Sequence, residues 1–383
     1  MTKTSTYAMA IVGGGINGLC AAYSAAERGI DSVILIDRFR IGHDRGSSHG
    51  QSRITRTAYA NSDYVRLMQV SHDREWPAIE KAVGSKLIYH VPGCFFGPGP
   101  KYAQYSDAIS RQDVNCTEIS VPEAKKMYPQ FAFPDTPAVL LDKTGGLIAA
   151  RDAVLGLREY LSGRITIAEG VTIESIDLGG SRIRLDSASD TIEAESVIVT
   201  AGPWAKQLCP ILEDRLTVAR QIVSYVTLDM PAEAHTIGAF PVWGYLGGGQ
   251  SVGYYGLPEY GRPGIKVAKH VTSGRDDSPD DPRPPAEEEI EDLKAFVDRC
   301  FTPSLVEIVG LETCHYTNTV SEDFIIDRHP DNPFCVIGAG FSGHGFKLGP
   351  ITGRALVDLA LDRSPGCDVF RDVQDRFSIG GRG

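Results

Sequence analysis

The chain has 383 residues, which is long for one domain and comfortable for two, so a two-lobed globular protein is the first expectation. Its 38 basic and 49 acidic residues give a formal net charge of -11, which argues against a surface that binds nucleic acid. The N-terminal apolar run is too short for a signal peptide, and no stretch of about 18 apolar residues follows, so we expect a cytoplasmic protein without a membrane partner. The 8 cysteines lack metal-ligand or redox-motif spacing, so we expect no metal site.

The first forty residues have the pattern of one βαβ unit. Residues 7–12 (YAMAIV) are expected to form a buried strand, and residues 32–37 (SVILID) a second one. Between them, residues 19–29 (LCAAYSAAERG) predict a helix of small residues that ends at Gly29. Such a unit is the usual start of a dinucleotide-binding domain.

The turn of this unit carries the spacing G-x-G-x-x-G. Gly13 is expected to make the tight turn, Gly15 to let the backbone approach a pyrophosphate, and Gly18 to let helix and strand pack closely. Asp37 ends the second strand, where it is placed to accept a hydrogen bond from a ribose hydroxyl. The motif predicts a dinucleotide but does not distinguish FAD from NAD, because both present the same ADP half.

The remainder of the chain alternates between segments expected in the nucleotide-binding domain and segments expected in a second lobe. Residues 64–83 read as a helix, residues 145–163 as a strand that turns into an amphipathic helix, and residues 196–208 as an apolar strand that ends on Ala201-Gly202-Pro203. A strand-rich stretch (220–270) and a polar run (272–292) suggest a second lobe and its surface loop, whereas FCVIGAG near the C-terminus returns to nucleotide-domain character. We therefore expect the domains to be interleaved.

Four motifs in order resemble those of monomeric sarcosine oxidase and related N-methyl amino acid oxidases, within the D-amino-acid-oxidase-like flavoproteins. They are GGGINGL at the start, GSSHGQSRITRTAY (46–59), YYGLPEYGRPGIKVAKH (254–270), and CHYTNTVSEDFIIDRHP with GFSGHGFK (314–347). The resemblance covers nearly the whole chain and implies FAD rather than NAD. It also implies an α/β fold, in which a Rossmann-like FAD-binding domain is interleaved with an α+β substrate domain on a mixed or antiparallel sheet.

The expected division assigns residues 1–85, 146–215 and 312–383 to the FAD-binding domain, and residues 86–145 and 216–311 to the substrate domain. The residues that the glycine motif and the resemblance assign to the cofactor are Gly13, Gly15, Ile16, Asn17, Gly18, Asp37, Arg38, Ser47, Ser48, Arg53, the Val171 and Thr172 pair, Ala201, Gly202, Trp204, Cys314, Gly343, His344, Gly345, Phe346 and Lys347.

The resemblance also implies roles for particular side chains. Cys314 matches the cysteine that carries the flavin through its 8α-methyl group, which a thiolate can attack because that position is electrophilic in oxidised flavin. Arg56 and Lys347 match the pair that binds the substrate carboxylate, a two-oxygen anion suited to a guanidinium and an ammonium. Lys266 matches the lysine that activates dioxygen by stabilising superoxide, although two lysines on one strand can also be exposed cations.

Less specific matches to the family complete the expected site. Arg53 matches an arginine beside the flavin ring, and His270, Tyr255 and Tyr316 match residues that shape the substrate pocket, although such side chains can equally be packing residues. The chain departs from the pattern where an acid is expected five residues after Arg56, since the nearby candidates are Asn61 and Asp63. This departure concerns the pocket and hence the amine substituent.

The resemblance implies a monomeric FAD-dependent oxidase that acts on the C–N bond of a secondary amino acid, with oxygen as acceptor and an imine and hydrogen peroxide as products. Alternatives stay open: a fructosyl amino acid oxidase, a pipecolate- or proline-type imino acid oxidase, a flavin dehydrogenase with another acceptor, a nicotinamide-dependent reductase, and a flavin-binding protein without oxidase activity. No general base is evident in the sequence, which suits a substrate that reacts as the neutral amine.

Overall fold

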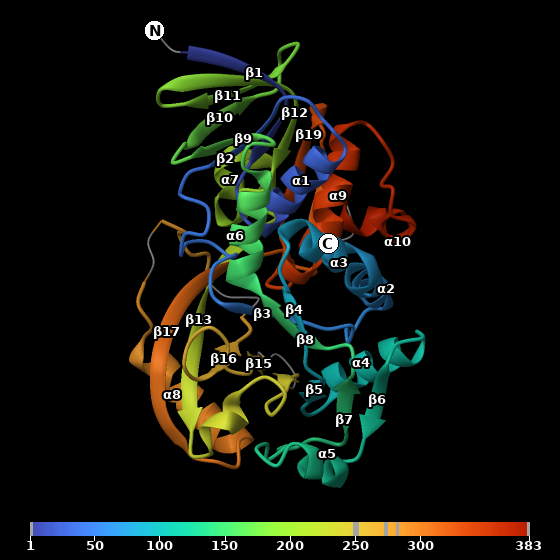
Figure 1. Ribbon diagram of the computed structural model, residues 1–383, viewed down its shortest axis with the longest axis vertical. Coiled ribbons are helices and arrows are strands. Elements are labelled where there is room, and N and C mark those ends of the chain that lie inside the picture. Colours follow the sequence, from blue (N-terminus) through green and yellow to red (C-terminus); the bar gives the residue numbers. More distant parts are fainter. Residues whose placement is uncertain (1–2, 248–252, 272–274, 281–282, 381–383) are drawn as a thin grey trace.

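The computed structural model describes residues 3–247, 253–271, 275–280 and 283–380. Its strands form two large sheets, one above the other in Figure 1, with a small sheet between them. Parts of the strand-rich stretch and of the polar run, namely 248–252, 272–274 and 281–282, lie outside the described residues. Within the described residues, no helix combines the length and the apolar character that crossing a bilayer requires.

The first sheet is built around the predicted βαβ unit. Strand β1 (Lys3–Val12) pairs in parallel with β2 (Val33–Asp37) and with β12 (Asp190–Val199), while α1 (Ile16–Glu27) makes the crossover. The other strands of this sheet are β9 (Thr166–Glu169), β10 (Ile173–Asp177), β11 (Ile183–Ser187), β18 (Ile325–His329) and β19 (Asn332–Ala339). The helix begins three residues before the predicted start, since Gly15 already serves as its N-cap.

One edge of β12 pairs with two different strands. Its first half pairs with the antiparallel strand β11, and its second half pairs in parallel with β19, which comes from the C-terminal part of the chain. Strand β19, which follows Cys314 in the chain, is thereby brought next to the strands of the N-terminal unit. The expected return of FCVIGAG to the nucleotide domain is confirmed, because these residues lie in or directly after β19.

Helices cover one face of this sheet. They are α1, α6 (Ala150–Leu161) and α9 (Gly349–Ala360), with α2 (Ser62–Val70), α3 (Trp76–Val83) and α10 (Asp368–Asp372) packed outside them. The apolar side chains between helices and sheet form the largest core cluster. Close approach of α1 and α9 depends on Gly353, where a Cβ would lie 2.5 Å from the backbone carbon of Cys20.

The predicted helix at 64–83 is interrupted. Residues Ser71–Glu75 form a π-helical turn between α2 and α3, and the backbone N–H of Trp76 bonds to the Ser71 carbonyl five residues earlier. Pro77 follows at the start of α3, where its missing N–H and its ring would disturb an unbroken α-helical ladder. The wider turn accommodates the proline without ending the helical path.

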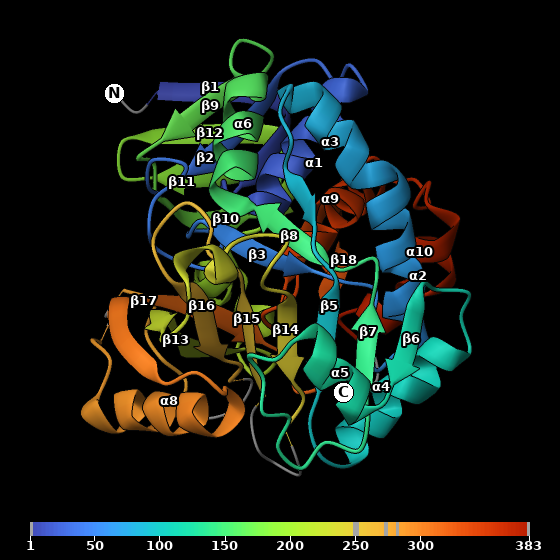
Figure 2. The same cartoon turned by 60° about the horizontal axis from the view of Figure 1, so that its bottom comes forward.

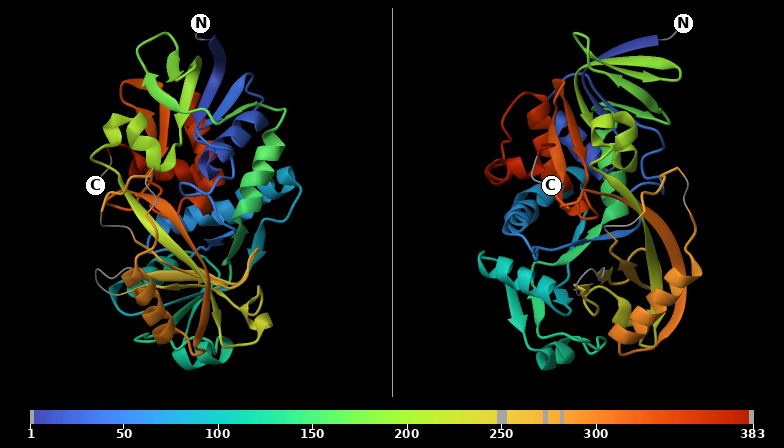
Figure 3. Two further views of the ribbon diagram at one scale, coloured as in Figure 1. Left: turned by 90° about the vertical axis from the view of Figure 1, so that its left-hand side faces the viewer. Right: turned by 180° about the vertical axis from the view of Figure 1, so that it is seen from behind.

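The second sheet is mixed and has eight strands. Its order is β17 (Leu305–Asn318), β13 (Thr217–Leu228), β16 (Ile265–Lys269), β15 (Tyr254–Leu257), β14 (Val242–Tyr245), β5 (Gly93–Phe96), β7 (Val139–Asp142) and β6 (Cys116–Ile119). Only the β14–β5 pair is parallel among these described strands. The long strands β13 and β17 curve around one side of the lower half (Figure 3).

An aromatic core lies between this sheet and its outer helices. Helix α8 (Glu287–Cys300) runs along the sheet in Figure 2, and α5 (Val121–Met127) lies at the other end. Trp243 stacks on Phe296, and Phe131 packs among Phe96, Phe240 and Phe301. The opposite face of the sheet is therefore free to face the first domain.

A three-stranded sheet connects the two halves. It contains β3 (Ser52–Thr55), β8 (Gly146–Ala149) and β4 (Ile88–His90). The α/β fold class with an interleaved mixed sheet is confirmed. The exact domain division stays a prediction, and because β17 runs unbroken through residue 312, we place the last boundary after Asn318.

Candidate active site

A single elongated cavity of about 440 Å³ is lined by residues from both large sheets. One end contains the glycine turn, and the lining continues to Cys314 on β17 and to Lys347 near the C-terminus. All the sequence-predicted site residues line this cavity except Gly18. The structure thus brings together side chains that are separated by more than 300 residues in the chain.

The glycine turn has little room for side chains. Gly13 has a φ of +105°, and a Cβ there would lie 2.4 Å from the Thr200 carbonyl oxygen. A Cβ on Gly18 would lie 1.8 Å from the Gly13 carbonyl oxygen, so Gly18 allows α1 to pack against its own turn and does not reach the cavity. Gly15 is the N-cap of α1 and lines the cavity, so the positive end of this helix lies at the lining, where an anion is favoured.

Asp37 ends β2 and lies at the same end of the cavity. Its two carboxylate oxygens accept hydrogen bonds of 2.7 Å, one from the Gly14 N–H and one from the Phe39 N–H. The carboxylate is thereby fixed beside the glycine turn while its remaining lone pairs stay available. A ribose hydroxyl is the donor that such a position commonly accepts.

Arg38 lies between two aromatic rings next to Asp37. Its guanidinium carbon is 5.0 Å from the ring centroid of Phe39 and 4.9 Å from that of Trp204. Asp280 comes from the other half of the chain, accepts a 2.9 Å hydrogen bond from Trp204 Nε1, and lies 3.3 Å from Arg38 Nη1. Asp280 thereby connects Arg38 and Trp204 to the segment before the next helix.

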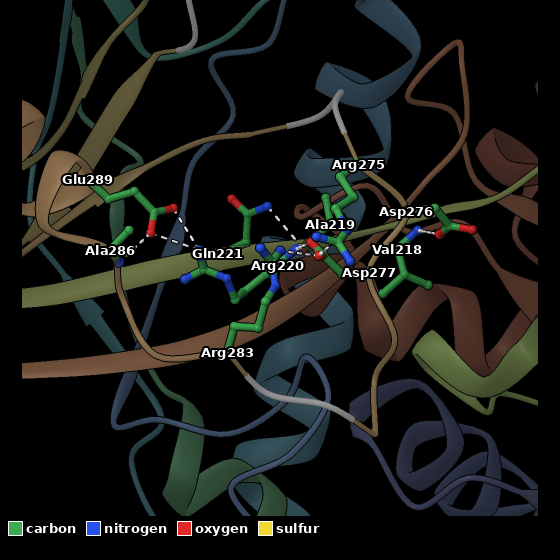
Figure 4. Close-up of polar contacts among 10 residues, drawn as sticks. All are labelled: Val218, Ala219, Arg220, Gln221, Arg275, Asp276, Asp277, Arg283, Ala286 and Glu289. Atoms are coloured by element: carbon green, nitrogen blue, oxygen red, sulfur yellow. Dashed lines mark hydrogen bonds and ion pairs between the residues drawn. The ribbon is translucent and has the colours of Figure 1, made fainter.

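Figure 4 shows how the segment that carries Asp280 is attached to β13. Asp276 accepts a 2.7 Å hydrogen bond from the Val218 N–H, and Asp277 accepts one of 3.0 Å from the Arg220 N–H. The Arg220 guanidinium in turn bonds both oxygens of Glu289 at 2.8 Å. The segment before α8 is thus held against β13, which explains why Asp280 reaches the nucleotide end.

Cys314 is the cysteine that lines the cavity, and its side chain is buried. Burial raises the pKa of its thiol, while the charges of Arg53 and Lys266 oppose that rise. All eight cysteines are free. The two neighbouring cations make Cys314 the thiol best placed to react as a thiolate at the cavity.

Lys266 on β16 is 2% exposed. Burial, followed by the charge of Arg53, lowers the pKa of Lys266 to about 7. Its Nζ donates a 3.1 Å hydrogen bond to the Ser52 carbonyl on β3. Arg53 is directed to the same strand and loop, with hydrogen bonds of 3.0 Å to the Ser52 carbonyl and 2.9 Å to the Ser47 carbonyl. The lysine is therefore a buried group of the cavity and not one of two exposed strand lysines.

Arg56 follows β3 and is directed toward the opposite wall. Its guanidinium carbon lies 4.1 Å from the Tyr59 ring centroid, and its Nη2 donates a 3.2 Å hydrogen bond to the hydroxyl of Tyr105 on α4 (Pro100–Ser110). Its Nη1 is buried without a hydrogen-bond partner in the described part of the chain. A buried guanidinium with a free donor requires an acceptor from a ligand or from water.

Lys347 lies in the turn Phe346–Leu348 and is 4% exposed. Its Nζ lies 5.8 Å from the Tyr59 ring centroid, so it shares this ring with Arg56. Burial, then the charges of Arg56 and Arg53, lower the pKa of Lys347 well below its usual value. Neither cation forms an ion pair with a carboxylate among the residues that the structure describes, and an anionic ligand would relieve their repulsion.

Three side chains form the wall between Lys266 and these cations. The hydroxyls of Tyr255 and Tyr316 are 3.2 Å apart, and the His270 ring lies 5.4 Å from the Tyr316 ring. Burial lowers the pKa of His270 to about 3 and raises the pKa of both tyrosines. All three side chains are therefore neutral near pH 7.

The glycines at 343 and 345 have a packing reason that the sequence did not reveal. A Cβ on Gly343 would lie 2.3 Å from the Tyr316 ring, and one on Gly345 would lie 2.5 Å from Phe341. The turn is thereby pressed against the wall of the cavity. Of the two residues near the expected position of the acid, Asn61 lines the cavity and caps α2, whereas Asp63 lies 3.6 Å from Arg376 and is not part of the lining.

The chemical groups that line the cavity suit an elongated dinucleotide. One end offers helix N–H groups and a fixed carboxylate, and the middle offers Cys314 and Lys266. The buried Nε of Arg38 has no partner within the described residues and is available at the nucleotide end. The far end offers two cations for a separate, anionic ligand.

Comparisons with known proteins agree with this geometry. Residues 9–359 match the family model described as FAD dependent oxidoreductase. The chain is 34% identical to the human peroxisomal sarcosine oxidase, over 96% of this chain and 95% of that protein. It is 29% identical to the monomeric sarcosine oxidase of Bacillus sp. (strain B-0618), over 94% of this chain and 93% of that protein.

A solved structure supports the fold. The structure of NikD, described as an unusual amino acid oxidase essential for nikkomycin biosynthesis, superposes with a TM-score of 0.80 at 20% identity. The match covers 96% of this chain and 97% of that one. At this identity the likeness concerns the fold alone.

Proposed function

Because the chain belongs to the family of FAD-dependent oxidoreductases, we propose that it oxidises the C–N bond of a secondary amino acid and passes the electrons to oxygen. One observation carries this proposal: Arg56 and Lys347 are buried cations without a carboxylate partner in the described part of the chain, and they face the same ring at the end of the cavity. A substrate carboxylate satisfies both, since an arginine binds two oxygens and a lysine supplies a point charge.

The glycine turn, Asp37, Arg38 and Trp204 would hold the ADP part of FAD, and Cys314, Arg53 and Lys266 would surround the flavin ring. Bound FAD supplies the two-electron acceptor that the side chains of a protein lack. The overall reaction removes two electrons and two protons from the C–H and N–H of the amine, giving an imine that water hydrolyses. Oxygen takes up two electrons and two protons to give hydrogen peroxide.

The side chains around the substrate position it without removing its protons. His270 is neutral because burial lowers its pKa to about 3, and Tyr255 and Tyr316 keep their protons because burial raises theirs. We propose that these three side chains orient the amine and exclude water, while the clamp of Arg56 and Lys347 sets its distance from the ring. Within the described residues no carboxylate forms a hydrogen bond or ion pair with His270, Tyr255 or Tyr316, which agrees with a neutral amine as the reacting form.

Lys266 would serve the reaction with oxygen. A buried ammonium stabilises negative charge that develops on oxygen, and the low surrounding polarity strengthens this effect. Its charge depends on its neighbours, because Glu312 and Cys314 favour protonation whereas burial and Arg53 oppose it. We propose that the ammonium form is the active one.

The attachment of FAD, the oligomeric state and the cellular compartment are also proposals. We propose that FAD is attached covalently to Cys314, and that the protein is a monomer. We further propose the cytoplasm as its compartment, although the human relative is named as peroxisomal. Eight free cysteines fit a reducing compartment.

The test is a panel of secondary amino acids mixed anaerobically with the yellow holoenzyme. Loss of the flavin absorbance with an N-methyl or cyclic secondary amino acid, followed by recovery and peroxide formation in air, supports the proposal. Bleaching without reoxidation by air would indicate a dehydrogenase that uses another acceptor. A protein that no amine of the panel bleaches would contradict the proposed oxidation.

A further inference from the structure

Lys101 is a cation of the substrate end that the proposed function does not use. It lies in the first turn of α4, and its side chain lines the same cavity as Arg56, Lys347 and His270. Four residues later on the helix, Tyr105 accepts the hydrogen bond from Arg56 Nη2. Residues four apart lie on the same face of a helix, so Lys101 stands one turn from the contact that holds Arg56.

The charge of Lys101 contributes to the pKa shift of His270, another residue of the cavity lining. Burial is the largest cause of the low pKa of His270, and Lys101 is the next cause, ahead of Arg56 and Lys347. These three cations therefore all act on one imidazole, and all four residues line the same cavity.

Lys101 is exposed at the cavity lining and lacks a protein partner of its own among the described residues. Its ammonium forms no hydrogen bond and no ion pair with residues 3–247, 253–271, 275–280 or 283–380, whereas nearby Lys269 is paired with Asp292 at 2.7 Å. The first turn of α4 holds no acidic residue, and its N-cap, Gly99, offers no side-chain acceptor. The helix N-terminus and the ammonium thus add positive potential at one place.

The acidic side chains of the cavity lie elsewhere. Asp37 is bound to the glycine turn, Glu312 is paired with Arg262 at 2.5 Å, and Asp323 lies 3.3 Å from Arg376. The fourth acidic residue of the lining, Glu322, is half-buried and forms no ion pair with Lys101 or any other described residue. A substrate with one carboxylate would occupy Arg56 and Lys347 and leave the Lys101 ammonium hydrated. A second anionic group on the substrate would give Lys101 a charged partner at the cavity lining.

We propose that the substrate is a secondary amino acid with two carboxylates, and that Lys101 binds the second one while Arg56 and Lys347 bind the first. This inference rests on the proposed function of the same site. The second carboxylate belongs either to the amino acid side chain, as in an N-methyl aminodicarboxylate, or to the substituent on nitrogen, as in iminodiacetate. The chemistry recognised by Lys101 is the same in both.

The experiment measures kcat/KM for two matched substrate pairs. N-Methylaspartate is compared with N-methylasparagine, and iminodiacetate with its monoamide, so that each pair differs by one charge at constant shape. The pair with the larger acid preference identifies which carbon chain carries the second carboxylate. The holoenzyme is compared with Lys101→Gln, Lys101→Arg and Lys101→Glu, and with Lys126→Gln as an exposed control on α5.

We expect the wild-type enzyme to prefer the acid of one pair by about tenfold or more, as one satisfied charge contact would give. Lys101→Gln should remove this preference, Lys101→Glu should reverse it, and Lys101→Arg should keep most of it. Lys126→Gln should leave the ratio unchanged. The effect should appear in KM with little change in kcat, because the contact is the same before and during the reaction.

Two results separate the possible failures. Equal acid-to-amide ratios in the wild-type enzyme and in Lys101→Gln, with oxidation of N-methylalanine intact, would overturn the role of Lys101 and leave the proposed function standing. No oxidation of any secondary amino acid would overturn the proposed function itself, and the inference with it.

Discussion

The indole Nε1 of Trp76 donates a 2.8 Å hydrogen bond to the backbone carbonyl of Lys347. The Ser71 hydroxyl donates a second bond of 2.8 Å to the same oxygen. Both donors are fully buried and lie at the two ends of the π-helical turn. The irregular turn therefore fixes the backbone from which the Lys347 ammonium reaches the cavity, in keeping with the frequent occurrence of π-turns at functional sites.

Replacing Trp76 with Phe removes one of these donors and keeps an aromatic ring against Phe346. We expect the free energy of unfolding to fall by about 1 kcal/mol, and the KM of a carboxylate substrate to rise roughly fivefold. Trp243→Phe is the matched control, because Trp243 is equally buried but its Nε1 has no hydrogen-bond partner in the described chain. Denaturant titration and steady-state kinetics measure both effects. Equal KM values in the two variants would contradict the role of the Trp76 bond.

Asp142 fixes the other half of the clamp. This fully buried carboxylate at the end of β7 accepts hydrogen bonds from the N–H groups of Thr57 at 2.8 Å and Ala58 at 2.9 Å, directly after Arg56. Asp142→Asn leaves at least one buried donor facing an amide N–H₂. We expect a loss of about 2–3 kcal/mol in stability and a KM increase of roughly tenfold for carboxylate substrates.

Asp358→Asn provides the comparison for this variant. Asp358 is also buried, pairs with Arg28 at 2.5 Å and accepts a bond from the Gly366 N–H, but neither of these partners adjoins a residue of the cavity lining. Its loss should lower the unfolding free energy and leave KM unchanged. A similar KM in the two variants would show that Asp142 stabilises the fold without positioning Arg56.

The pH dependence of oxygen consumption should report on Lys266. A lysine is charged below its pKa, and burial lowers the pKa of Lys266 to about 7. We therefore expect kcat/KM for oxygen to be highest at low pH and to fall as pH rises through 7 or somewhat above, where the ammonium loses its proton. Lys266→Met should lower this constant by roughly 100-fold and abolish its pH dependence in this range. Unchanged oxygen kinetics would favour a dehydrogenase with another acceptor.

Cys314→Ala tests the covalent link. After acid precipitation of the wild-type holoenzyme, we expect the yellow colour to stay with the protein pellet. In the variant the colour should pass into the supernatant, because FAD would then be held by noncovalent contacts alone, which acid denaturation removes. Cys335→Ala is the control, since Cys335 is a buried cysteine of β19 that does not line the cavity. Release of flavin from the wild-type protein would contradict the link.

The sequence predicted the parts of the site that depend on local patterns. The turn at Gly13 and Gly15, and Asp37 at the end of the second strand, follow from strand and helix periodicity within forty residues. The family motifs then predicted Arg56, Lys266, Cys314 and Lys347, all of which line one cavity. Their roles stay predictions.

Residues that act through tertiary packing were not predictable. Tyr105 and Lys101 lie on α4, and only the packing of that helix brings them to Arg56. Asp142 and Trp76 bond to backbone groups far away in the chain, for which no spacing rule exists. The π-turn was missed because residues 64–83 keep helical periodicity, and Pro77 was the one local signal of a break.

The central claim is that the clamp of Arg56 and Lys347 presents a secondary amino acid to the flavin. Its most direct test is anaerobic reduction of the holoenzyme by N-methyl amino acids, each compared with the amine that remains after loss of its carboxylate, such as sarcosine with dimethylamine. The account predicts that at least one amino acid bleaches the flavin at least 100-fold faster than its amine, and that air restores the colour with one peroxide per substrate. Equal rates within every pair, or no bleaching at all, would contradict it.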